Sequence, residues 1–133
     1  MNNNSQQFQV QKVANVWWML KFTFGLVPIL AGLDKLGFNF ITNWAKYLNP
    51  TLVNMVPVSQ TQLLYLVGVI EIIAGLLVLT HWTRFGAYLV AAWLTLIAVT
   101  LIPMGMYDIS IRDIGLAIGA LSLGMLTEAL GKK

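Results

Sequence analysis

Four long apolar stretches dominate the hydrophobic pattern of this chain. They cover about residues 16–36, 63–80, 85–103 and 110–130. A helix needs about 20 mostly apolar residues to cross roughly 30 Å of hydrocarbon. The last stretch has only 14 uncharged residues, Ile114–Thr127, and these cover about 21 Å at about 1.5 Å per residue. It therefore spans a bilayer only if Arg112 and Asp113 come to the membrane edge or enter it.

The segments between these stretches complete the predicted architecture. Polar residues 1–15 should form a tail outside a single membrane domain at 16–130. The one long connection, residues 37–62, has Gly37, Phe40, Ile41, Trp44 and Leu48 at helical spacing. This spacing predicts a short helix lying flat on the membrane surface, with Pro50 at its end. The predicted fold is all-α: an integral membrane four-helix bundle with a short interfacial helix in the first loop.

The composition excludes most soluble and cofactor-bearing classes. Hydrophobic residues make up 58% of the 133 residues and charged residues only 10%, whereas a soluble domain carries about 25% charged residues. The chain has no cysteine, which excludes disulfides, thiol catalysis, iron–sulfur ligation and a Cys-rich zinc site. Its single histidine, His81, excludes a haem held by two imidazoles of this chain. We therefore expect no catalytic residues and no metal site.

The charge distribution predicts a membrane topology. The net charge is +3, but the basic residues lie at helix ends and form no stripe, so we expect no nucleic-acid partner. With four spans, both termini share one side of the membrane. That side holds five basic residues, Lys12, Lys21, Arg84, Lys132 and Lys133; the other side holds three, Lys35, Lys46 and Arg112. The positive-inside rule then predicts a multi-pass membrane protein with cytoplasmic N- and C-termini.

Helical spacing places charges on the same faces as small residues. The three predicted faces are Lys21, Gly25, Pro28, Gly32 and Lys35; Gly68, Glu71 and Gly75; and Arg112, Gly115, Gly119 and Ser122. Small residues face other helices because they let backbones approach closely. We therefore expect Gly25, Gly32, Gly68, Gly75, Gly115 and Gly119 to pack between helices, and the charges to point into the bundle.

Glu71 is the strongest candidate for a site residue, because a lone carboxylate near the middle of a membrane span costs free energy. Its candidate partners are Lys21, Lys35 and Arg112. Three roles stay open: a buried ion pair that fixes helix register, a ligand-binding or proton-handling site, and a neutral hydrogen-bonded acid. Lys21 could instead reach the interface. Asp34 and Asp113 are either interfacial residues or members of a salt-bridge network with Lys35 and Arg112.

The chain resembles the DoxX-like family of small four-helix bacterial membrane proteins. The resemblance rests on Gly32-Leu33-Asp34-Lys35 closing the first span and on Gly68-x-x-Glu71-x-x-x-Gly75 in the second. Thr83-Arg84 opening the third span and Arg112-Asp113 opening the fourth support it. It covers about Leu20–Leu126. It implies an inner-membrane four-helix bundle, and some relatives, including the DoxD type, are subunits of thiosulfate:quinone oxidoreductase.

Three functions follow as expectations. The first is a non-catalytic accessory or anchoring subunit of a membrane-associated, quinone-linked oxidoreductase complex. The second is a binding or transport module for a small amphipathic molecule, a quinone or a lipid, that meets Glu71 and a basic partner. The third, through the resemblance alone, is a subunit of a thiosulfate:quinone oxidoreductase. The expected partners are the lipid bilayer and other membrane or membrane-associated subunits. We expect this chain alone to hold no cofactor; a quinone is the candidate cofactor of a complex that contains it.

Overall fold

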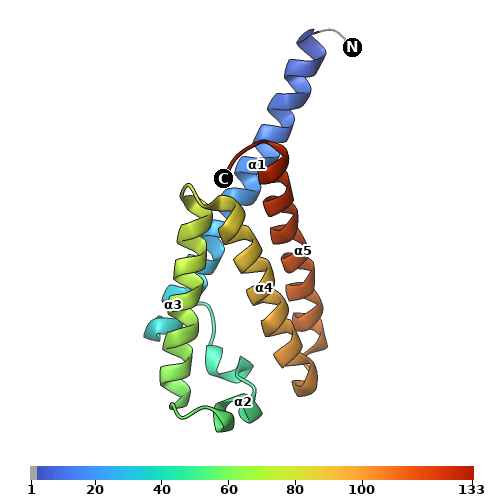
Figure 1. Ribbon diagram of the computed structural model, residues 1–133. Helices are drawn as coiled ribbons and strands as arrows, with labels where there is room; N and C mark the ends of the chain where they lie inside the picture. Colours follow the sequence, from blue (N-terminus) through green and yellow to red (C-terminus); the bar gives the residue numbers. More distant parts are fainter. Residues whose placement is uncertain (1–2) are drawn as a thin grey trace.

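The protein is an all-α bundle of four long helices (Figure 1). A computed structural model describes residues 3–133. The long helices are α1 (Asn3–Leu33), α3 (Gln60–Leu79), α4 (Thr83–Leu101) and α5 (Tyr107–Ala129). Each belongs to a segment long and apolar enough to cross a membrane. The predicted four-helix fold is therefore confirmed.

Helix α1 is longer than the first predicted span. It has 31 residues and continues into a five-residue π-helix, η1 (Asp34–Phe38). Its first turns extend past the end of the bundle (Figure 1). Residues 3–15, expected as a polar tail, thus continue the helix, while residues 1 and 2 of that tail lie outside the described residues.

The first connection is helical, but it is divided differently from the prediction. The structure has two short helices, η2 (Trp44–Tyr47) and α2 (Pro50–Met55), in place of one helix over residues 37–48. The side chains of Asn43 and Asn49 each accept a backbone N–H at the start of one helix. Pro50 therefore opens α2 instead of ending a helix, since proline is favoured in the first turn.

The four helices form two closely packed antiparallel pairs. Helix α1 packs along α3, and α4 packs along α5, while α3 and α4 contact each other less extensively. In Figure 1, α3 and α4 are close at the end where their short connection lies and separate toward the other end. The first connection contributes η2 to the packing against α3.

Glycines bring α1 and α3 into backbone contact. A Cβ atom on Gly75 would meet the carbonyl oxygen of Gly25, and one on Gly68 would meet that of Gly32. The two pairs lie one above the other along the antiparallel interface. The four glycines that the sequence placed between these helices therefore stand at the α1–α3 contact.

The buried face of α5 differs from the predicted one. A Cβ atom on Gly115 would meet no other group within 4 Å, and Arg112 and Ser122 are exposed; of the predicted stripe, Gly119 alone approaches another helix, at the ring of Phe24. The buried residues of α5 are Ser110, Asp113, Ala117, Ala120, Leu123, Gly124 and Thr127. Alanine and serine allow close approach as glycine does, so the packed face is turned by about one residue, or about 100°.

Gly75→Ala should lower the free energy of unfolding by about 1–3 kcal/mol, because the added methyl group meets backbone that cannot rotate away. Gly115→Ala is the matched control at an exposed position; it should change stability by no more than about 1 kcal/mol, toward higher stability. Unfolding of both variants in mixed micelles measures this. Equal effects of the two substitutions would show that α1 and α3 do not meet at Gly75.

Candidate functional site

The bundle holds an ion pair between α3 and η1, the π-helix that follows α1. Lys35 Nζ lies 2.7 Å from Glu71 Oε2. Both residues are buried, with exposed fractions of 8% for Lys35 and 7% for Glu71. Glu71 shares its helix face with Gly68 and Gly75, where α1 approaches most closely. Of the three partners left open by the sequence, the structure thus pairs Glu71 with Lys35.

A tryptophan from a third helix also contacts Glu71. Trp93 Nε1, on α4, donates a hydrogen bond of 3.4 Å to Glu71 Oε1. The carboxylate is therefore held from α4 as well as from η1. Trp93 was not among the predicted site residues. A tryptophan in the middle of an aliphatic span was the available signal, because a buried indole N–H needs an acceptor.

The lysine side of the pair rests on an aromatic ring. Lys35 Nζ lies 3.7 Å from the centroid of the Trp44 ring, within cation–π range. Trp44 belongs to η2 in the first connection. The π-helix at the end of α1, which winds more residues per turn than an α-helix, carries Lys35 to this position. The loop therefore supplies one wall of the site.

Asp34 organises that loop. Its carboxylate accepts hydrogen bonds from the backbone N–H of Phe40 at 2.6 Å and of Ile41 at 3.0 Å. It also accepts one from Trp44 Nε1 at 2.7 Å. Asp34 thus forms no ion pair with Lys35 or Arg112, the network that the sequence had left open. Its three bonds place the Trp44 ring over the Lys35 ammonium group.

Asp113 reaches the site from α5. It is 6% exposed and lies close enough to interact electrostatically with both Glu71 and Lys35. Its ion-pair partner is Arg112, at 3.5 Å from Asp113 Oδ1, and the Arg112 side chain is 64% exposed. The predicted inward position of Arg112 is therefore wrong. The adjacent Asp113 faces inward instead, because it lies on the packed face of α5.

Lys21 belongs to a different region. Its side chain is buried, but its Nζ donates to the carbonyl oxygen of Thr80, at 3.4 Å. Thr80 caps the end of α3 that is remote from the first connection. Lys21 is therefore no partner of Glu71.

The charges at the centre do not balance. Asp34, Glu71 and Asp113 are buried acids, and Lys35 is the buried base beside them. Counting the exposed Arg112 still leaves one negative charge in excess when all five groups are ionised. Such a site attracts a proton or a hydrogen-bond donor. Among residues 3–133, no group of three or more His, Cys, Asp or Glu residues could hold a metal ion.

Comparison with known proteins identifies no relative of this chain. No family model, curated protein or solved structure matches the chain. The resemblance to the DoxX-like family therefore stays a prediction.

A double-mutant cycle should detect strong coupling between Lys35 and Glu71. Lys35→Met leaves a carboxylate buried without its cation, and we expect a loss of about 3–5 kcal/mol in the free energy of unfolding. Adding Glu71→Met removes the unpaired carboxylate, so the double variant should recover most of the lost stability. The single Glu71→Met variant completes the cycle. Unfolding in mixed micelles measures all three variants.

The matched control is Lys46→Met, because Lys46 is exposed in the same connection. Its stability should stay near that of the wild type. Strict additivity of the Lys35 and Glu71 substitutions would contradict the pairing.

Proposed function

We propose that this chain is a membrane-integral binding module for the polar head of a small amphipathic molecule, a quinol or a lipid. The head would lie beside Glu71, Asp113 and Lys35. The observation that carries the proposal is the excess of buried acid. A pair that only fixed helix register would need one acid and one base, whereas here three acids, Asp34, Glu71 and Asp113, are buried with one lysine, Lys35.

The hydrogen bonding of the acids supports a donor-bearing head group. The bond from Trp93 to Glu71 is long, at 3.4 Å, and the contact from Arg112 to Asp113 is 3.5 Å. Strong bonds to a carboxylate are about 2.5–2.9 Å. Both carboxylates therefore keep acceptor capacity for a hydroxyl group.

The remaining contacts suit a ring with both hydroxyl and carbonyl oxygens. Lys35 supplies N–H donors for a carbonyl, and the two carboxylates accept from a hydroxyl. Trp44 and Trp93 contribute aromatic surface on two sides of the ion pair. A quinol and its quinone have this combination of groups on one flat ring, and their isoprenoid or alkyl tail suits the apolar surroundings.

A role as an accessory or anchoring subunit has separate support. The first turns of α1 extend beyond the bundle (Figure 1), and Phe8, Val10 and Val13 are exposed there. Apolar side chains on a helix outside the bundle favour a protein partner. The two roles are compatible, since a quinone-binding subunit can also anchor a complex.

The topology is part of the proposal. The N-terminal turns of α1 and the end of α5 lie at the same end of the bundle (Figure 1). Lys12, Lys132 and Lys133 belong to this end, and Arg84 contacts it through its backbone N–H, which donates to Lys133 O. We infer from the positive-inside rule that this end faces the cytoplasm. The bacterial inner (cytoplasmic) membrane is proposed from the resemblance to the DoxX-like family.

Glu71→Gln should weaken binding of a short-chain ubiquinol by roughly tenfold, because a neutral amide accepts a weaker hydrogen bond than a carboxylate. Isothermal titration into the chain in nanodiscs measures the affinity. Expressed as free energy, the loss of ubiquinol affinity should exceed any change in the free energy of unfolding. Asp108→Asn on the exposed start of α5 is the control and should leave binding unchanged.

Two results would redirect the proposal. A Glu71→Gln variant that loses stability but binds ubiquinol as the wild type does would assign Glu71 to fixing helix register. Absence of ubiquinol binding by the wild type, together with a stable heteromeric assembly after gentle detergent extraction, would favour the anchoring role.

Reporter fusions test the topology. Alkaline phosphatase fused after Lys133 should be inactive, and the same enzyme inserted at Gly105, in the turn between α4 and α5, should be active. Alkaline phosphatase needs the oxidising periplasm for its disulfides. The reverse pattern would place the termini outside the cytoplasm.

A further inference from the structure

A buried lysine at the other end of the bundle has no acidic partner. Lys21 is 9% exposed, and its hydrogen-bond acceptor is the single carbonyl oxygen of Thr80, at 3.4 Å. The ion pairs among residues 3–133 are Lys35–Glu71 and Arg112–Asp113. This buried ammonium group therefore has one long hydrogen bond and no carboxylate to balance its charge.

The ammonium groups of Lys21 and Lys132 both lie near the ring of Trp17. Lys21 Nζ lies 4.8 Å from the centroid of the Trp17 ring, and Lys132 Nζ lies 4.7 Å from it. The two lysines are close enough to repel each other. Trp18 adds a further ring, 5.3 Å from Lys21 Nζ. These four residues form what we call the terminal basic cluster.

The backbone that carries Lys132 is fixed by hydrogen bonds. Gly131, at φ +68°, ends α5 in a left-handed conformation that suits glycine. The N–H groups of Gly131 and Lys132 donate to the carbonyls of Glu128 and Thr127, each at 2.9 Å. This is the Schellman pattern of a helix end. Lys132 is therefore held at the cluster by an ordered turn.

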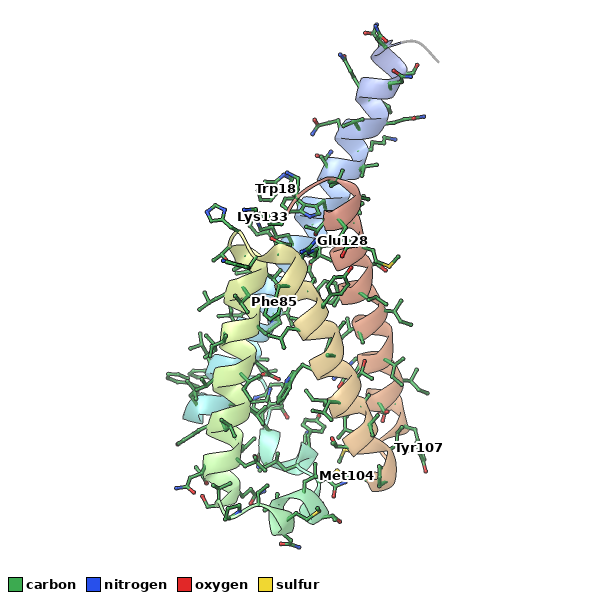
Figure 2. The ribbon with its side chains drawn as sticks, viewed as in Figure 1. Trp18, Phe85, Met104, Tyr107, Glu128 and Lys133 are labelled. Atoms are coloured by element: carbon green, nitrogen blue, oxygen red, sulfur yellow. The ribbon has the colours of Figure 1, made fainter. Side chains whose placement is uncertain are left out.

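The same turn is tied to two other helices. The Arg84 N–H donates to Lys133 O at 2.9 Å, and Trp17 Nε1 donates to Thr127 Oγ1 at 2.9 Å. Figure 2 shows Trp18, Glu128 and Lys133 together at this end of the bundle. The terminal basic cluster therefore joins α1 to the end of α5, and α4 holds the turn beside it through Arg84.

Acidic side chains at this end do not neutralise the cluster. Glu128 is the acidic side chain there among the described residues, and its Oε1 accepts a hydrogen bond of 2.8 Å from Tyr88. Arg84 and Lys133 are two further basic residues at this end, where the Arg84 backbone N–H donates to Lys133 O. The cluster therefore has an excess of donors and positive charge, the complement of an anion with several oxygens.

We propose that the terminal basic cluster binds the phosphate group of an anionic membrane phospholipid. Lys21 and Lys132 supply the two cations, from inside the bundle and from its rim. Trp18 is 47% exposed and stacks on Phe22, with 5.6 Å between ring centroids. Exposed tryptophans of this kind lie at the level of lipid head groups. This favours a lipid over free phosphate as the source of the anion.

Native mass spectrometry of the delipidated chain with dioctanoyl phosphatidylglycerol tests the proposal. One lipid should bind with preference over dioctanoyl phosphatidylcholine. Lys21→Met and Lys132→Met should each weaken phosphatidylglycerol binding about fivefold, the effect of one basic residue near an anionic lipid surface. Lys12→Met is the matched control, because Lys12 lies on the exposed part of α1 and contacts the Phe8 ring.

The outcomes separate the sources of the anion. If a large excess of inorganic phosphate fails to displace the lipid, the site is specific for a lipid. If phosphate displaces the lipid, the cluster recognises the phosphate group in either form. Equal affinity for the two lipids, or wild-type binding by Lys132→Met, would overturn the proposal. The latter result decides the matter even if Lys21→Met does not fold, because Lys132 is exposed.

Discussion

The contact between Lys35 and Glu71 is the constraint on which the rest of the bundle depends. A carboxylate in the middle of a membrane-spanning helix is unstable without a partner, and its partner here comes from the end of another helix. To make the 2.7 Å contact, α1 must run close along α3, and glycines on both helices permit that approach. Burial of Glu71 therefore requires both its ion pair with Lys35 and the close glycine contact between α1 and α3.

The same pair connects the bundle to the first connection. Asp34, next to Lys35 in sequence, holds the backbone of the loop and the indole of Trp44. Trp44 in turn covers the Lys35 ammonium group. The loop is thus part of the site. A change in this connection would alter the surroundings of the ion pair without touching either charged residue.

Much of this arrangement could be predicted from the sequence, and the rest depends on contacts that have no local signal. The lengths of the apolar stretches predicted four long helices, and the costs of burying charge indicated that Glu71 needs a partner. The glycine spacing placed Arg112 on the inward face of the fourth span, but alanines and a serine form the packed face, about 100° away, and this face carries Asp113. The π-helix at Asp34–Phe38 and the contact from Trp93 arise from tertiary packing, which a reading of single helices does not include.

Magic-angle-spinning NMR of the chain in lipid bilayers tests the central claim most directly. Glu71 and Glu128 are the two glutamates of the chain, so ¹³C-labelled glutamate carboxyls with ¹⁵N-labelled lysine side chains isolate the pair. We predict one nitrogen–carbon distance under about 4 Å, as a direct hydrogen bond requires, which disappears in Lys35→Met and persists in Lys46→Met. A Glu71 carboxyl with no lysine nitrogen nearby, in contact with lipid chains, would contradict the pairing and the packing that depends on it.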